Sequence, residues 1–473
     1  MKFNLHFPVK AIIIIFAFSI LFFPSFFYTP RAFALSIEEE KILGQKFLGQ
    51  IQKYYEFVND DFVDQFFNDL GHYLITPLKT KPFHFHFYII KDNTLNAFAA
   101  PGGHIFFYSG LIEMTDDIDM LAGVLGHEIG HVAARHLSKR IEQNKKIGLA
   151  TMAGVLAGVF IGGAAAEALI SGPLAAGTQA QLHYSRNDER QADQLGFKYT
   201  KQAGFDPSGL PGALKKMQES HWGANHIPPY LLTHPAGPER LANFDAMLSN
   251  YSPGPSKKEA ERFRALYPFF KTVVSAQCLE SHEAEKFFNL ELKKNPGSPL
   301  AYFGLGIVCR QKLNYDQAIS FFKHAIAAKP NSLILLKNLS ETYQMKGLDE
   351  EAISILKKAF ELDDQDLSIL FLMAVSYENL GQYEKAISLL ERLASYRVVK
   401  KEVFYHLGIS YGRQNRLPLA HYNFALYFKK SGQHKKALFH FQTADELSSD
   451  DSPLKKKIRN AIKKHKPGPV QKF

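Results

Sequence analysis

Cysteine is scarce in this chain of 473 residues, which contains only Cys278 and Cys309. Two cysteines exclude a disulfide framework and any cysteine-rich zinc site. They leave open either two buried thiols or one single bridge. The length predicts two or more domains, because a typical domain has about 100 to 200 residues.

Excess charge is also scarce over most of the chain, although the formal net charge is +10. Eight lysines and arginines, with no acidic residue among them, lie between Ser452 and Phe473, so the rest of the chain carries only about +2. This distribution indicates a near-neutral protein with a basic tail over 451–473 and argues against a nucleic-acid site. A solvated tail is the simpler interpretation, and peripheral contact with anionic lipid is the alternative.

Charged residues are absent from Ala11–Phe27, which follows two lysines and spans about 17 residues, the short limit for crossing a bilayer. An Ala-Phe-Ala triplet that ends at Ala34 places small residues where a signal peptidase reads them. We therefore expect an export signal over 1–34 that is cleaved after Ala34. An uncleaved membrane anchor is the alternative, and Pro24 within the run disfavours it.

A His-Glu-x-x-His motif is formed by His127, Glu128 and His131 within an apolar run of helical periodicity. Residues four apart share one helix face, so the two imidazoles have the spacing that a zinc ion needs. Glu128 can reach a metal-bound water without being a ligand, although a helix with two ordinary histidines is the alternative. Gly126 and Gly130 each cost about 1 kcal/mol relative to Ala, which makes sense where another group approaches the backbone closely.

A second helix with matching polar residues is predicted after Ser185, which can cap its first turn. Glu189 and Asp193 are four apart and share a face of this helix. Alone they would indicate a solvated surface. With the upstream motif they indicate a third zinc ligand, Glu189, and an acceptor that orients a ligand histidine, Asp193. Three protein ligands plus one water form the open site used in catalysis, so we expect one zinc ion per chain.

Between the two helices lies a stretch almost without charge, Gly148–Ala180, in which Glu167 is the exception. It is long enough to suggest a membrane helix, but Gly162-Gly163 and Gly172-Pro173 break it. We expect a mobile helical flap or lid over the site, and a membrane-inserting hairpin is the alternative.

Before the motif, the sequence predicts a helix, a strand, a loop closed by Pro-Gly-Gly and a second strand: Ser36–Ile75, Phe83–Ile90, Leu95–Gly103 and His104–Tyr108. Ser109 is expected to cap a short helix. His84 and His86 are interpreted as exposed strand positions. Strands directly before a metal helix can hold an extended peptide by main-chain hydrogen bonds, so Asn96 and His104 are predicted to mark a substrate-binding edge strand.

Near residue 250 the composition shifts to Ser, Pro, Gly and Lys, which predicts a linker over 251–262. Beyond it residues recur at a period of 34, which indicates tetratricopeptide helix pairs over 263–450. Ala437 and Phe441 continue the pattern half a repeat out of step, so the helix near Pro418–Lys429 is expected to serve two units. A generic helical bundle does not explain five matches at one period. The matching alanines are Ala284, Ala318, Ala352, Ala386 and Ala420.

Three motifs follow one another along the chain: Asn-Ala-Phe-Ala-Ala-Pro-Gly-Gly, His-Glu-Ile-Gly-His and Ser-Arg-x-x-Glu-x-x-Ala-Asp. In this order they resemble the motifs of the HtpX-related and CAAX-processing zinc endopeptidases. Over nearly its whole length the chain more closely resembles their soluble periplasmic relatives, the BepA-like outer-membrane-protein assembly-enhancing proteases of Gram-negative bacteria. The loop departs from the family pattern at Ala100, where Leu is usual. The resemblance implies His127, His131 and Glu189 as zinc ligands and Glu128 as catalytic base.

The implied fold is mainly α, with an α+β zinc-metallopeptidase domain over 35–250 that has a small edge-strand sheet, followed by an α-solenoid. The implied function is a periplasmic zinc endopeptidase that hydrolyses misfolded or misassembled envelope proteins. Its repeats would deliver unfolded substrates or dock onto an outer-membrane assembly complex. The alternative is a periplasmic chaperone or adaptor for outer-membrane protein precursors, with a mostly latent zinc site.

A regulatory role is hypothesised for His234, which a following proline keeps out of a helix. It could take the fourth position on zinc and displace the catalytic water, so that the resting enzyme is latent, whereas a surface loop histidine is the alternative. The residue that stabilises the oxyanion stays open among His183, His221 and Arg240. His136 is expected to lie off the ligand face and to be dispensable for zinc binding.

Overall fold

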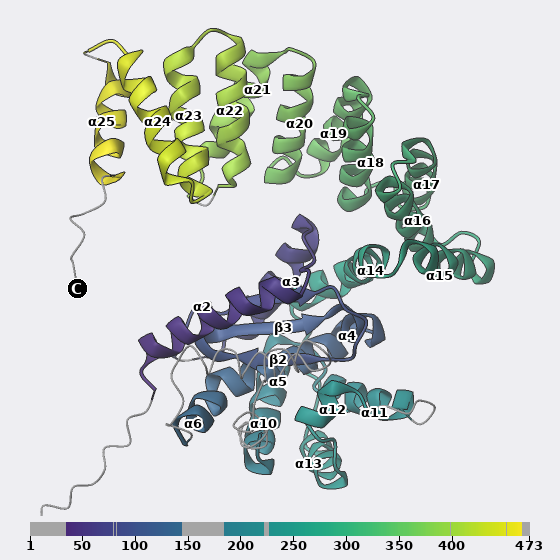
Figure 1. Ribbon diagram of the computed structural model, residues 1–473. Coiled ribbons are helices and arrows are strands. Elements are labelled where there is room, and N and C mark those ends of the chain that lie inside the picture. The colour runs from purple at the N-terminus through teal and green to yellow at the C-terminus, as the bar shows by residue number, and fades with distance from the viewer. Residues whose placement is uncertain are drawn as a thin grey trace, which may run out of the picture.

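The computed structural model describes residues 35–78, 80–81, 83–143, 184–221, 227–397, 399–450 and 452–465. The predicted export signal and the predicted flap over 148–180 lie outside these ranges. Figure 1 shows a small sheet wrapped by helices, with a solenoid of helix pairs arching above it. None of the described helices is long and apolar enough to cross a membrane. The predicted fold class is confirmed.

The sheet has three strands, β1 (His86–Ile90), β2 (Ala97–Ala100) and β3 (His104–Tyr108), in the order β1-β3-β2. β1 pairs with β3 in parallel, and β2 pairs with β3 antiparallel. The strand prediction for 104–108 is confirmed, but the loop prediction over 95–103 is wrong for β2. A short 3-10 turn, η1 (Pro101–Gly103), folds β2 back onto β3, because Gly102 and Gly103 adopt positive φ angles of 75° and 89°.

The predicted N-terminal helix is divided into α2 (Ile37–Tyr54) and α3 (Asp61–Leu74). Between them Phe57 forms an antiparallel bridge with Ile90 of β1, so the chain is extended where a single helix was expected. Asp60 caps α3 with its side chain. Ser109 does not cap α4 (Ser109–Met114) as expected, because its hydroxyl is bonded to the backbone of Asp92 instead.

The remaining helices of this part are α5 (Ile118–Ala133), α6 (His136–Gln143), α10 (Arg186–Ala203), α11 (Gly209–His221), α12 (Pro229–Thr233) and α13 (Pro238–Ser249). α5 lies in the centre, between the sheet and α10 (Figure 1). The two helices approach so closely that a Cβ atom on Gly196 would lie 2.9 Å from the His127 nitrogen. A Cβ atom on Gly130 would lie 2.8 Å from the Ala192 carbonyl oxygen. The close approach of α10 to α5 therefore explains why glycine occupies these positions.

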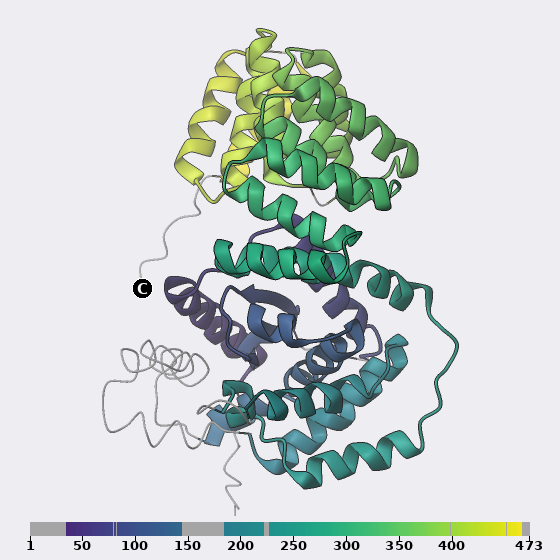
Figure 2. The same ribbon diagram turned by 90° about the vertical axis from the view of Figure 1, so that its right-hand side faces the viewer.

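An extended segment leads from α13 to α14 (Lys258–Cys278) along one side of the molecule (Figure 2). α14 begins inside the range predicted as linker. Its aromatic residues pack on both parts of the chain: Phe270 stacks on Phe66 of α3 at 4.4 Å between ring centroids, and Phe269 contacts Phe303 at 5.8 Å. The peptidase part and the first repeats therefore share one continuous hydrophobic core.

The repeats form antiparallel helix pairs along the solenoid: α15 (Ser281–Lys294), α16 (Pro299–Gln311), α17 (Tyr315–Ala328), α18 (Leu333–Met345), α19 (Asp349–Leu362), α20 (Leu367–Asn379), α21 (Tyr383–Ala394), α22 (Lys401–Arg413), α23 (Leu417–Lys430), α24 (His434–Glu446) and α25 (Pro453–His465). All five alanines of the 34-residue pattern are buried, as stacked helix pairs require. α23 packs on both α22 and α24, which confirms that one helix serves two units.

The predicted basic tail is partly structured, because α25 covers the end of the solenoid. Ile458 is fully buried against α24, and Leu454 and Ile462 pack beside it. These apolar residues recur at helical spacing among the lysines, which the charge count alone conceals. Both cysteines are free and buried, so the single bridge is not formed.

We expect Gly196→Ala to destabilise the protein by about 1–3 kcal/mol, because the new Cβ forces α10 away from α5. Gly49→Ala in α2 is the matched control, since a Cβ atom there would meet nothing within 4 Å among the described residues outside its own stretch of helix, and Ala is the better helix former by up to about 1 kcal/mol. Denaturant unfolding measures both. Equal stability of the two variants would contradict the close helix contact.

Candidate metal centre

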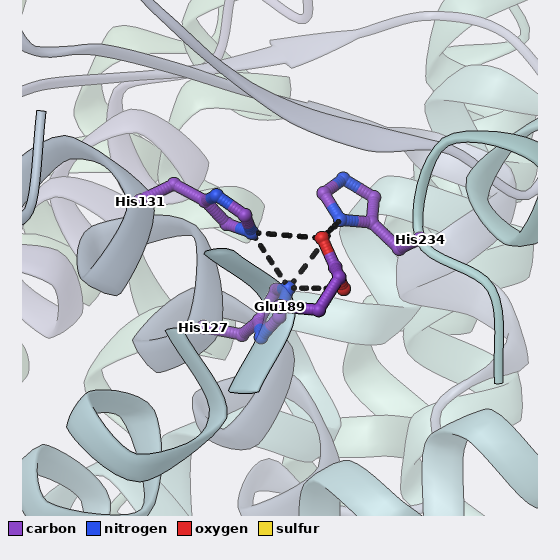
Figure 3. Close-up of side chains that lie close together, drawn as sticks. All are labelled: His127, His131, Glu189 and His234. Carbon is purple, nitrogen blue, oxygen red and sulfur yellow. Dashed lines mark hydrogen bonds and ion pairs between the residues drawn. The ribbon is translucent and has the colours of Figure 1, made fainter. Parts of the chain in front are cut away.

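Four potential metal ligands meet beside the sheet, contributed by three segments of the chain. His127 and His131 come from α5, Glu189 comes from the first turns of α10, and His234 follows α12. One donor atom from each lies within 4.8 Å of all the others, and all four side chains are buried (Figure 3). The three predicted ligands and the predicted regulatory histidine are thus brought together.

The donor atoms face a common point. The Nε2 atoms of His127 and His131 are 3.0 Å apart. His127 Nε2 lies 3.5 Å from Glu189 Oε2, and His131 Nε2 lies 3.3 Å from Glu189 Oε1. The Nδ1 atom of His234 lies 2.9 Å from Glu189 Oε1. Zinc usually binds four donors in a tetrahedral arrangement, and imidazole nitrogens and carboxylate oxygens are among its usual ligands. This set of residues therefore fits a zinc ion.

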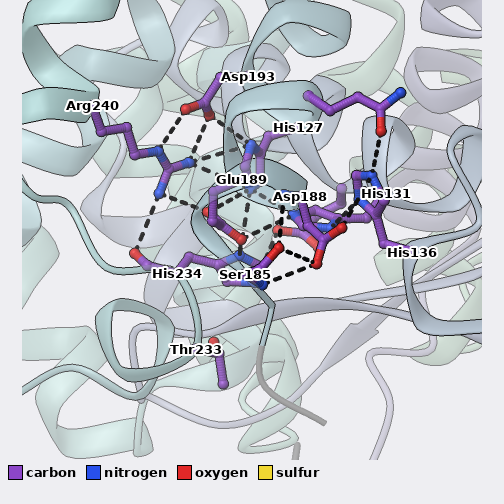
Figure 4. Close-up of polar contacts among 12 residues, drawn as sticks. His127, His131, His136, Ser185, Asp188, Glu189, Asp193, Thr233, His234 and Arg240 are labelled. Atoms are coloured by element: carbon purple, nitrogen blue, oxygen red, sulfur yellow. Dashed lines mark hydrogen bonds and ion pairs between the residues drawn. The ribbon is translucent and has the colours of Figure 1, made fainter. Parts of the chain in front are cut away.

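Arg240 and Asp193 form hydrogen bonds and ion pairs with members of this cluster (Figure 4). Asp193 Oδ1 lies 2.9 Å from His127 Nδ1, and Arg240 donates two hydrogen bonds of 2.7 Å to the Asp193 carboxylate. Arg240 also pairs with Glu189 at 2.9 Å and donates to the His234 carbonyl oxygen. Its guanidinium group is therefore engaged in holding the cluster, which disfavours the oxyanion role left open for it.

The electrostatics of the site favour ionised carboxylates. Burial and Arg240 favour a neutral His127, yet its hydrogen bonds to Asp193 and Glu189 outweigh both and raise its pKa to about 9. Burial also opposes ionisation of Glu189, but the histidines around it hold its pKa well below the usual value. Burial lowers the pKa of His131 well below its usual value, so a divalent cation bound here would have to displace a proton only from His127 of these two ligands, because metal ligands must be deprotonated.

Glu128 directly follows His127 on α5, and its role as catalytic base stays a prediction. Its side chain is fully buried, and neither carboxylate oxygen has a hydrogen-bond partner among the described residues. A buried carboxylate without partners is costly unless a ligand or water completes its surroundings. His234 Nε2 lies 3.7 Å from Glu128 Oε1, too far for a hydrogen bond.

Two tyrosines that sequence reasoning missed enclose His234. The Tyr230 ring lies 4.7 Å from the His234 ring and the Tyr184 ring 5.3 Å, with interplanar angles of 31° and 28°. Both phenol oxygens are buried and have no hydrogen-bond partner among the described residues. The sequence signal for the contact with His234 was the position of Tyr230, four residues earlier in the chain.

The prediction that His104 belongs to a substrate-binding edge strand is wrong, because β3 is the central strand. Its ring stacks on His86 at 5.1 Å, and its Nδ1 atom lies 3.1 Å from the Tyr88 hydroxyl oxygen. Asn96 directly precedes β2, an outer strand of the sheet, and accepts a hydrogen bond from Tyr108 through its carbonyl oxygen. His183 and the side chain of His221 lie outside the described residues.

His136 is not among the four clustered donors, but it lies directly behind one of them. It is fully buried, and its Nδ1 atom lies 3.0 Å from Nδ1 of His131. It therefore contacts the ring of a predicted ligand on the side away from the cluster, and its dispensability for zinc binding stays a prediction. The turn that produces this contact has no signal in the periodicity of the sequence.

A His-Glu-x-x-His helix whose histidines meet a glutamate of a second helix defines a metallopeptidase type of site. Residues 67–248 match the model of peptidase family M48, so this part of the chain is similar to the M48 peptidases. The resemblance to that group of peptidases is confirmed. Residues 311–393 match a second model, described as subunit 3 of the anaphase-promoting complex, and this match lies within the repeats.

Several curated proteins match parts of the chain. The beta-barrel assembly-enhancing protease of Yersinia pestis is 31% identical over 231 residues, which are 48% of this chain and 48% of that protein. Mitochondrial metalloendopeptidase OMA1 of Schizosaccharomyces pombe is 30% identical over 164 residues, 34% of this chain and 46% of that protein. The chain thus spans about half the length of the curated relatives it matches.

Among solved structures, the tetratricopeptide protein YrrB matches 44% of this chain and 95% of its own. The identity is 19% and the TM-score is 0.25, too low for the likeness to support any functional statement.

We expect Glu189→Gln to lose stoichiometric zinc, because a neutral amide replaces the anionic ligand between two imidazoles. His84→Ala, which removes an exposed histidine outside the cluster, is the control and should retain the metal. Metal analysis of the purified proteins measures both. Full zinc occupancy in Glu189→Gln would remove this residue from the ligand set.

Proposed function

We propose that the protein is an exported zinc-dependent endopeptidase that hydrolyses misfolded or misassembled envelope proteins in outer-membrane protein quality control. The observation that carries the proposal is the buried His127–His131–Glu189 cluster beside the unpartnered Glu128 carboxylate. It lies within the residues that match peptidase family M48, and one relative carries the name of a beta-barrel assembly-enhancing protease.

Zinc, when bound, supplies Lewis-acid chemistry that acidifies a water and polarises a substrate carbonyl. His127, His131 and Glu189 would hold it. Glu128 would accept a proton from the attacking water and later donate it to the leaving amine of the cleaved peptide bond. Asp193 accepts the Nδ1 proton of His127 and thereby keeps the Nε2 lone pair directed into the cluster.

The solenoid supports the docking part of the proposal, because stacked helix pairs present extended surfaces to polypeptides. The periplasmic location rests on the apolar sequence of 1–34 and on the named relative. Peripheral contact with anionic lipid would fit the basic residues of the tail, of which Lys456, Lys457 and Lys463 are exposed on α25.

The second candidate function is a chaperone or adaptor whose zinc site is mostly latent. His234 favours latency, because its ring reaches from Glu189 to within 3.7 Å of Glu128, the space in which water and base would meet. The rings of Tyr184 and Tyr230 hold it there. Substrate or partner binding would have to displace this segment before cleavage.

Glu128→Gln tests the proposal, because it removes the base and keeps the shape of the side chain. We expect it to retain zinc and to lose peptide hydrolysis by a factor of about 100 or more. Proteolysis of an unfolded outer-membrane protein measures the loss. If the variant loses hydrolysis but supports outer-membrane assembly as well as the unaltered protein, the chaperone function replaces the protease function.

His234→Ala tests latency. We expect it to raise basal proteolysis, including self-cleavage, several-fold and to keep zinc, since three donors remain. Leu232→Ala, which changes an exposed residue on the short helix that precedes His234, is the matched control. Unchanged or lower activity of His234→Ala with zinc still bound would refute the latch.

A further inference from the structure

The turn after α5 directs His136 back toward the metal cluster. In a continuous helix, His136 would point about 140° away from His131, since each residue adds about 100°. α5 instead ends at Ala133, and Arg135 adopts a left-handed backbone with φ of 53° before α6 begins at His136. A left-handed conformation is unfavourable for a residue with a side chain, so the surrounding structure has to stabilise it.

Arg135 is held in this turn by the N-terminal helix. Its guanidinium group donates hydrogen bonds of 3.1 and 2.7 Å to the carboxylate of Glu40 in α2 and one of 2.6 Å to the carbonyl oxygen of Leu35. Glu40 is only 4% exposed, so this ion pair is partly shielded from solvent. The contact between α2 and the α5–α6 turn therefore fixes where His136 points.

The hydrogen bonds of His136 allow one arrangement of protons when His131 binds a metal. His131 presents Nε2 to the cluster, so the neutral ring carries its proton on Nδ1 and donates it to His136 Nδ1 at 3.0 Å (Figure 4). His136 must then carry its own proton on Nε2. It donates that proton to Oε1 of Gln191 at 2.9 Å. The chain of hydrogen bonds ends on α10, two residues after Glu189.

We propose that His136 is a positioning residue that fixes the tautomer and the ring orientation of His131 as a metal ligand, and that Gln191 fixes His136 in turn. The inference rests on the proposed role of His131 in holding zinc. It makes the two ligand histidines unequal: an anionic carboxylate supports His127, whereas a neutral imidazole supports His131. Partners of this kind typically change metal affinity by about 10- to 100-fold.

His136→Phe removes the acceptor and keeps a ring in the buried space. Zinc affinity, measured by competition with a chelator, should fall about 10- to 100-fold. The visible absorption of the cobalt-substituted protein should also shift, because the His131 ring is no longer held. Thermal unfolding of the metal-free protein separates this effect from a loss of the fold.

Variants of the exposed residue Gln191 are expected to give a result that a purely structural role would not produce. Gln191→Glu keeps an acceptor for the Nε2 proton of His136 and makes it anionic, so zinc affinity should equal or exceed that of the unaltered protein. Gln191→Leu removes the acceptor, so affinity should fall several-fold. Because both variants change the same surface position, the sign of the difference reports the hydrogen bond.

Equal zinc affinity of Gln191→Glu and Gln191→Leu would overturn the proposal. So would zinc affinity within twofold of the unaltered protein, with an unchanged cobalt spectrum, in a folded His136→Phe variant. If the unaltered protein itself binds no zinc, the proposed function fails together with this inference. If it binds zinc normally and the variants do not differ, only the inference fails.

Discussion

The close contact between α5 and α10 is the constraint on which the site depends. Glycines on both helices bring the backbone of α10 against that of α5, and no side chain intervenes at Gly196 or Gly130. Only this approach lets the short side chain of Glu189 reach histidines of another helix. The helix-breaking tendency of glycine is thus offset by the geometry that it permits. A larger helix separation would leave the three donors as unrelated polar residues.

The residues of the site could be predicted from sequence because, within each helix, the four-residue spacing of the polar residues places them on one face. His127 and His131 are fixed by one turn of α5, and Glu189 and Asp193 by one turn of α10. Helical periodicity determines such local relations almost completely. The solenoid was predictable for a similar reason, since every repeat contacts only its neighbours and repeats the same buried alanine.

The parts that could not be predicted depend on single backbone conformations. The hairpin of β2 needs two consecutive glycines with positive φ, and the position of His136 needs one left-handed arginine. Neither conformation changes the hydrophobic pattern that sequence reasoning uses. The apolar stripe of α25 was hidden by its lysines, because a charge count ignores the face on which each charge lies.

The turn at Arg135 also connects the metal cluster to the edge of the domain. α2 supplies Glu40 to hold Arg135, and its Phe47 packs against Phe98 of β2 and Phe106 of β3. The same helix therefore stabilises both the outer strand of the sheet and the turn that aims His136. A displacement of α2 would act on the sheet and on the support of His131 together. The support of His127 comes from α10 and Arg240 instead, so the two ligand histidines are tied to separate parts of the fold.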